Sequence, residues 1–124
     1  MNQQDRVVLT LPARGEFART ARLTAAELAA RIGMSVDGID DVKMAVEEAF
    51  VFVTGRRVGE AVTFDFLLSD GIELLVGPME GSCSDQEGET GERYARFILE
   101  SVCDEFELVD LAGGCFVRLV KRMA

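Results

Sequence analysis

Five segments of the chain alternate between apolar and polar residues, and this alternation predicts five β-strands. They are residues 7–11, 62–68 and 72–76, a segment that begins with Phe106 and Leu108, and residues 115–121. Pro12 ends the first strand. The turn sequences Ser69-Asp70-Gly71 and Gly113-Gly114 join the second strand to the third and the fourth to the fifth, which predicts two hairpins.

Three further segments carry apolar residues at helical spacing. In residues 17–32, and again from Ile39 to Val53, apolar residues return at helical intervals, which predicts two helices with one buried face. Gly33 stands where the first helix needs a C-terminal cap, and Ser35 can cap the start of the second. The third helix is predicted at about 91–104 from the apolar positions Tyr94, Phe97, Ile98 and Val102.

The predicted order of elements is β-α-α-β-β-α-β-β. It favours an α+β fold, a two-layer sandwich with a mixed, mainly antiparallel sheet and the helices on one face. With 124 residues and no internal repeat, residues 1–124 are expected to form a single domain. The segment 79–90 has no periodicity and four carboxylates, and we expect it to be a mobile, solvated loop.

The charge balance narrows the classes of partner. The net charge is −9, which does not favour direct binding to nucleic acid or to an anionic membrane. No apolar run approaches the roughly 20 residues of a membrane span, and the first residues are polar, unlike a signal peptide. We therefore expect a cytoplasmic protein whose partners are basic protein surfaces or a cation.

The residue types that are absent or scarce restrict the chemistry. The chain has no histidine, so imidazole acid–base catalysis and His-metal sites are excluded. The three cysteines have no C-x-x-C spacing, and we expect neither a disulfide nor a metal site, with Cys103 and Cys115 as buried thiols. The acidic residues of 79–90 lack the spacing of a calcium loop.

Two motifs resemble a known family. The stretch Ala21-Arg22-Leu23-Thr24 and the stretch from Ile39 to Ala49 (IDDVKMAVEEA) resemble the anti-sigma factor serine kinases, which belong to the histidine-kinase-like, Bergerat-fold ATPases. The resemblance extends from Val8 to about Val120 and agrees with the predicted element order. It implies a protein that binds ATP with Mg²⁺, phosphorylates a serine on an anti-anti-sigma partner and sequesters a sigma factor.

The first ATP-binding box of that family is only half present. The family carries E-A-x-x-N on a helix, where the Glu acts as a base or positions water and the Asn oxygen binds Mg²⁺. The resemblance implies that Glu48 is the Glu and that Phe52 stands at the Asn position. An aromatic ring cannot replace an oxygen ligand of Mg²⁺, so Glu48 is at most a vestigial catalytic residue.

The other two boxes also depart from the family pattern. Aligning residues 72–76 with the strand that precedes D-x-G puts Pro78 at the Asp and Glu80 at the Gly; a slip of one or two residues would offer Glu80-Gly81 instead. The third, glycine-rich box corresponds to residues 89–93 and keeps only Gly91, among carboxylates that would repel a triphosphate.

These departures predict an anti-sigma-factor-like regulator that binds a protein partner stoichiometrically, with ATP binding and kinase activity lost and no cofactor or metal. The partner would be a sigma factor or an anti-anti-sigma factor. Two alternatives stay open: an active serine protein kinase, and a self-associating subunit such as a homodimer. Arg14, Arg19 and Arg22 are the candidate partner contacts. Phe52 is expected to fill the vacated nucleotide cavity, against Leu74 or Val76 of the sheet.

Overall fold

A computed structural model of the chain describes residues 4–85 and 90–123. Its strands are β1 (Asp5–Pro12), β2 (Val58–Leu68), β3 (Gly71–Met79), β4 (Glu105–Leu111) and β5 (Gly114–Arg122). Its α-helices are α1 (Ala18–Arg31), α2 (Val36–Thr54) and α3 (Thr90–Val102), and two short 3₁₀ turns are η1 (Gly15–Phe17) and η2 (Cys83–Asp85). The predicted order of strands and helices is confirmed.

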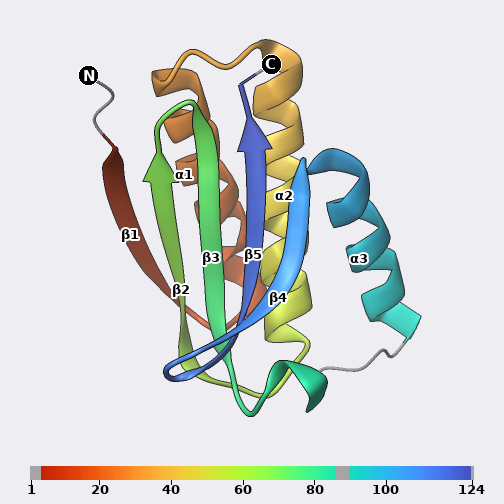
Figure 1. Ribbon diagram of the computed structural model, residues 1–124. Helices are drawn as coiled ribbons and strands as arrows, with labels where there is room; N and C mark the ends of the chain where they lie inside the picture. Colours follow the sequence, from red (N-terminus) through yellow and green to blue (C-terminus); the bar gives the residue numbers. More distant parts are fainter. Residues whose placement is uncertain (1–3, 86–89, 124) are drawn as a thin grey trace.

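The five strands form one sheet in the order β1-β2-β3-β5-β4, and the helices cover one of its faces (Figure 1). All four neighbouring pairs of these strands are antiparallel, so the predicted mixed sheet is wrong. The reason lies in the two helices between β1 and β2. A single crossover helix gives two reversals of chain direction and returns the chain for a parallel strand. With both α1 and α2 between the strands there are three reversals, so β2 runs opposite to β1.

The ends of the first two helices follow the capping signals in the sequence. The Ser35 hydroxyl accepts a hydrogen bond from the Gly38 N–H at 3.1 Å, which satisfies one of the free donors at the start of α2. Gly33 has a φ of 88° directly after α1, a conformation that glycine adopts without steric cost. Both predicted caps are therefore confirmed.

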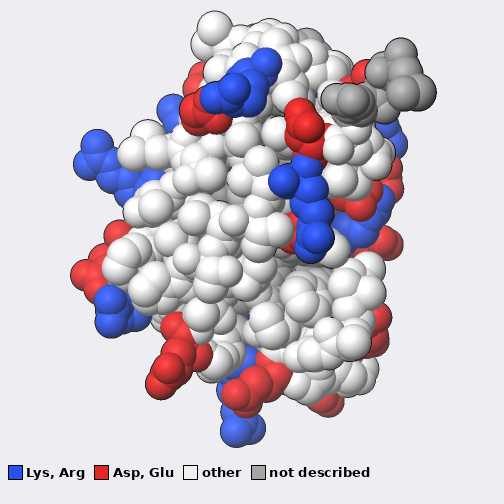
Figure 2. Space-filling view, turned by 90° about the vertical axis from the view of Figure 1, so that its left-hand side faces the viewer, with Lys and Arg blue, Asp and Glu red and all other residues white. Residues whose placement is uncertain are grey.

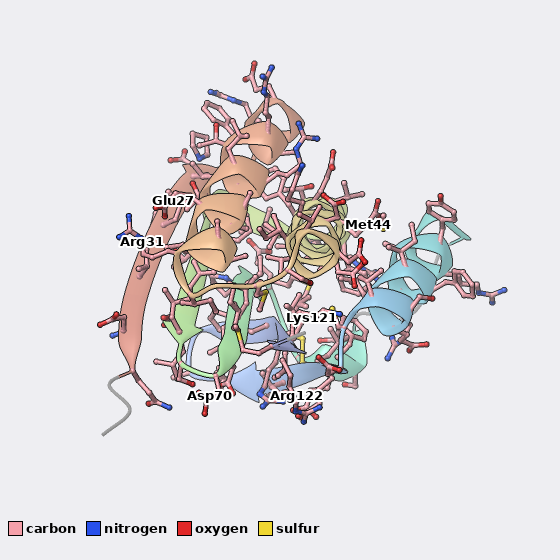
Figure 3. All side chains as sticks on the ribbon, turned by 90° about the horizontal axis from the view of Figure 1, so that it is seen from above. Glu27, Arg31, Met44, Asp70, Lys121 and Arg122 are labelled. Carbon is pink, nitrogen blue, oxygen red and sulfur yellow. A yellow bond between two sulfur atoms is a disulfide. The ribbon has the colours of Figure 1, made fainter. Side chains whose placement is uncertain are left out.

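The core lies between the sheet and α2, the middle helix of the layer (Figure 3). Phe50 stacks on Phe64 at 5.7 Å between ring centroids, and Phe64 stacks on Phe66 at 6.3 Å. Lys121 of β5 ties the layers together at the opposite end, since its Nζ donates to Asp41 of α2 at 2.9 Å and to the Val102 carbonyl of α3 at 3.1 Å. No helix in the described residues is long and apolar enough to cross a membrane.

The segment after β3 is more structured than the sequence indicates. β3 extends to Met79, and η2 forms within the predicted loop. Residues 86–89 of that loop lie outside the described residues, so its predicted mobility stays a prediction.

Cys83 and Cys115 form a disulfide with a Cα–Cα separation of 5.0 Å, which corrects the expectation of unpaired thiols. Cys115 is buried as expected, but it is bonded. The cause is tertiary: β3 and β5 are neighbours, with Met79 opposite Cys115, and the chain reaches Cys83 four residues later. Spacing along the sequence does not reveal this proximity. Cys103 is the free cysteine.

Candidate functional site

The two residues aligned with the first ATP-binding box lie one turn apart in the C-terminal half of α2. Glu48 is half-buried, and its burial, together with the neighbouring charge of Glu47, raises the pKa of its carboxyl group. Glu47 itself accepts from Arg22 of α1 at 3.3 Å. This end of the site is therefore crowded with negative charge, and Glu48 is the carboxylate that lacks a basic partner within 4 Å among the described residues.

Phe52 is buried, with 3% of its surface exposed. Its ring meets Phe106 of β4 edge-on at 6.4 Å between centroids, and the Arg56 guanidinium lies over it at 5.1 Å. Arg96 of α3 covers the Phe106 ring in turn, at 5.4 Å. Phe52 thus fills the space where α2, α3 and β4 meet. Its ring partners are not the expected Leu74 and Val76, although both belong to the same buried cluster.

Pro78 and Glu80, aligned with the second box, do not join Phe52. Pro78 lines a hollow of about 320 Å³ together with Asp65, Leu75 and Phe116, on the sheet face opposite the helices. Glu80 is exposed just after β3, where its N–H donates to the Arg57 carbonyl at 2.7 Å and its carboxylate lies 3.7 Å from the Arg57 guanidinium. In this register, Pro78 has no side-chain acceptor and lies on the sheet face opposite the helices.

Gly91, the remaining glycine of the third box, is in the first turn of α3. Glu89 precedes it and lies outside the described residues. α3 packs beside α2, so the structure does bring the first and third boxes onto neighbouring elements.

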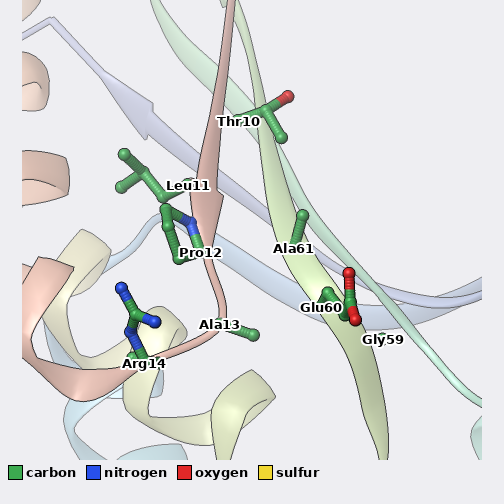
Figure 4. Close-up of a pocket in the computed structure, with 8 residues that line it drawn as sticks. All are labelled: Thr10, Leu11, Pro12, Ala13, Arg14, Gly59, Glu60 and Ala61. Atoms are coloured by element: carbon green, nitrogen blue, oxygen red, sulfur yellow. The ribbon is translucent and has the colours of Figure 1, made fainter.

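The three arginines that the sequence singled out for partner contact differ in how they are held. Arg14 is exposed, forms an ion pair with Glu16 at 2.9 Å and lines a hollow of about 680 Å³ where β1 and β2 diverge (Figure 4). Arg19 is exposed on α1 and has no ion pair among the described residues. Arg22 is half-buried by its pairing with Glu47. Arg19 is therefore the most available of the three.

Exposed apolar residues on the helix layer were not recognised from the sequence. Tyr94 and Phe97 of α3 are 67% and 68% exposed, whereas Ala95 and Leu99 form the buried side of that helix. The sequence does carry a signal for this exposure. Residues 95, 98, 99 and 102 already form one complete apolar stripe along α3, so Tyr94 and Phe97 are more apolar residues than one buried side needs. Met44, on the outer surface of α2 in Figure 3, adds to this exposed set, as do Leu23 and Val51. On the β1 and α1 side, Figure 2 shows charged side chains around a largely uncharged centre.

Comparison with known proteins identifies relatives along most of the chain. The serine-protein kinase RsbW of Halalkalibacterium halodurans is 28% identical over 91% of this chain and 81% of its own length. RsbW of Bacillus cereus strain Q1 is 31% identical over 61% of this chain, and RsbW of Listeria monocytogenes is 35% identical over 58%. The chain is therefore similar along most of its length to serine-protein kinases named RsbW. It spans about half the length of the Bacillus and Listeria proteins.

The fold agrees with the likeness to RsbW proteins. The crystal structure of the RsbU and RsbW domains of a Mycobacterium tuberculosis protein superposes with a TM-score of 0.72 at 20% identity, over 96% of this chain and 32% of that one. This likeness shows the Bergerat-like fold predicted from the sequence. No protein-family model matches the chain.

Proposed function

We propose that this RsbW-like chain is a single regulatory domain, residues 1–124, that controls a sigma factor by stoichiometric binding and neither binds ATP nor transfers phosphate. The burial of Phe52 is the observation that carries the proposal. Mg²⁺ requires oxygen ligands in near-octahedral geometry, and Phe52 supplies none at the position where the family has its Asn. Its ring also occupies the volume between α2, α3 and β4.

The surroundings of Phe52 support the same conclusion. Glu48 is retained, but it lies beside Glu47, and both carboxylates would repel a triphosphate. Pro78 is directed to the other face of the sheet, so it offers no acceptor for the amino group of adenine. An active serine kinase remains the alternative that Glu48 favours, because a carboxyl group with a raised pKa is a better general base than an ordinary one.

The proposed partners are a sigma factor and an anti-anti-sigma factor of the same bacterium, in the cytoplasm, with no direct role for nucleic acid. Arg19 and the exposed apolar residues of the helix layer suit such an interface, since arginine and large apolar residues are common in protein–protein contacts. The overall charge of −9 favours partner surfaces with basic residues. Self-association into a homodimer is compatible with this role.

The first experiment is titration of the purified chain with ATP and Mg²⁺ by calorimetry, beside an RsbW relative that carries all three boxes. We expect heat of binding from the relative and none from this chain at millimolar nucleotide. An isotherm with micromolar Kd, or transfer of ³²P to an anti-anti-sigma protein, would establish the kinase alternative and refute the proposal.

The second experiment tests the partner. A sigma factor from the same genome is titrated against the parent chain, Arg19→Ala and Arg31→Ala. Arg31 is the matched control on α1, because it is exposed and already paired with Glu27. We expect Arg19→Ala to weaken binding about tenfold and Arg31→Ala to have little effect. If no sigma factor or anti-anti-sigma factor of the genome binds, and sedimentation shows only self-association, the structural-subunit alternative holds.

A further inference from the structure

The disulfide joins two parts of the chain that are 32 residues apart in sequence. Cys83 begins η2 and is half-buried, whereas Cys115 in β5 is fully buried. Pro78 and Glu80 precede Cys83, and Gly91 follows it. The bond therefore attaches to the sheet the stretch of chain that connects the second and third nucleotide boxes.

The turn η2 depends on this attachment for its place on the sheet. It contains no buried residue of its own. The Ser82 N–H and hydroxyl donate to Asp85 at 3.0 and 3.1 Å, which shapes the turn locally. The Cys83 N–H donates to Asp110 of β4 at 2.8 Å. The disulfide thus supplies a covalent link from η2 to the β4–β5 hairpin, and the Asp110 bond supplies a polar one.

A bond of this kind is unusual in the compartment that the proposed function implies. Thiol reductants such as thioredoxin keep cytosolic cysteines reduced in most bacteria, and the disulfides that do form there are usually transient or regulatory. Cys103 does not compete for either sulfur, because burial raises the pKa of its thiol to about 12 and keeps it protonated at neutral pH. Exchange is thereby confined to Cys83 and Cys115.

We propose that Cys83 and Cys115 form a reversible thiol–disulfide switch that attaches η2 to the sheet when oxidised and releases it when reduced. The compartment, and the partner whose binding would change, rest on the proposed function. The bond itself and its effect on η2 do not.

The reaction is an exchange with a dithiol reductant of the thioredoxin class. A thiolate of the reductant attacks Cys83, the more accessible sulfur, and the S–S bond breaks; Cys115 leaves as a thiolate and takes up a proton. The second thiol of the reductant then attacks the mixed disulfide and releases Cys83 as a thiol. The reductant leaves as a disulfide, oxidised by two electrons, and the reverse reaction with that disulfide restores the bond.

The test compares the full chain equilibrated with glutathione disulfide and with dithiothreitol. After denaturation and alkylation, we expect one labelled cysteine in the oxidised sample and three in the reduced sample. We expect amide hydrogen exchange of residues 82–85 to be at least tenfold faster after reduction, with β2 unchanged. Cys83→Ser should exchange like the reduced parent under both conditions, and the matched control Cys103→Ser should keep the full response.

Several results would overturn the switch. They are three labelled cysteines in the oxidised sample, a bond that resists dithiothreitol in the native protein, and equal exchange of residues 82–85 in both states. A fourth is a stoichiometric Zn²⁺ that the reduced protein retains through dialysis. Cys83, Cys115 and Asp110 offer two sulfurs and a carboxylate oxygen within 4.8 Å of one another, so retained Zn²⁺ would make them a metal site.

Whether the switch regulates partner binding is tested by titrating a sigma factor against the oxidised and the reduced chain. We expect the two Kd values to differ at least threefold. Equal affinities would refute regulation of that partner by the switch. If neither form binds any sigma factor, the proposed function fails, and the labelling and exchange results still decide whether the switch exists.

Discussion

The C-terminal half of α2 and the turn η2 both adjoin the segments aligned with the nucleotide boxes, but different forces hold them. Phe52 lies in the buried cluster, where its ring meets Phe106 of β4 edge-on and the Arg56 guanidinium covers it. At η2 the structure rests on local hydrogen bonds, one bond to Asp110 and a disulfide. Aromatic packing does not depend on the redox state of the solution, whereas a disulfide does. We therefore expect the packing around Phe52 to persist in both redox states and the position of η2 to change between them.

The largest expected loss of stability comes from removing the ring of Phe52. Phe52→Ala should cost roughly 3–5 kcal/mol of unfolding free energy, as for other buried phenylalanines. Because its neighbours come from other elements, the cavity cannot close easily. Thermal melts should show Tm lowered by roughly 10–20 °C.

Two further variants serve as controls for the Phe52→Ala melt. Val51→Ala is the matched control, since Val51 adjoins Phe52 but is 50% exposed, and it should change Tm little. Phe52→Asn should destabilise as much as Phe52→Ala without restoring ATP binding, because the amide would be buried without a metal. A Tm within 2 °C of the parent for Phe52→Ala would contradict its structural role.

Loss of the disulfide is the next largest effect. Opening a loop of this length lowers the free energy of unfolding by at most about 3–4 kcal/mol, by the chain-entropy relation. Under oxidising conditions, Cys83→Ser should therefore unfold at a lower denaturant concentration than the parent. The reduced parent should match the variant, and Cys103→Ser should match the oxidised parent. Coincident unfolding curves for all four samples would contradict the stabilising role of the bond.

A smaller effect tests whether the N-terminal cap of α2 contributes the same stability whatever the state of the disulfide. Ser35→Ala removes the acceptor for the Gly38 N–H and should cost about 1 kcal/mol. The cost should be the same in oxidised and reduced protein, because α2 begins at the end of the molecule away from η2 and its disulfide (Figure 1). Chemical denaturation in both redox states measures it, and a cost that depends on redox state would show that the two ends are coupled.

The smallest effect concerns the pH dependence contributed by Glu48. Its pKa is raised in the folded state by burial and by Glu47, so the folded protein holds this proton more tightly than the unfolded chain does. Stability is therefore lost as pH rises from the ordinary carboxyl pKa through the folded value. Glu48→Gln should flatten that part of the profile and raise stability at neutral pH. A parallel profile for the variant, from denaturation at pH 4–8, would contradict this assignment.

The helices and strands could be predicted from the sequence because their signals are local. Ser35 and Gly33 mark helix ends through bonds and backbone angles of nearby residues, and the alternation in 62–68 requires only one buried face. The family likeness was also visible, since it rests on contiguous motifs. The sequence located α3, but it did not separate the buried side of that helix from the exposed one, because Tyr94 and Phe97 are apolar and yet exposed.

The sequence by itself determined the order of the elements and showed the likeness to the anti-sigma factor kinases, in which Phe52 aligns with an asparagine of the first box. Only the tertiary structure decided that the sheet is antiparallel throughout, that Phe52 packs against Phe106 and that Cys83 bonds to Cys115. Each of these depends on residues far apart in the chain that are brought together by strand pairing and helix packing. Local periodicity records which face of an element is buried, but it carries no information about which distant element covers that face.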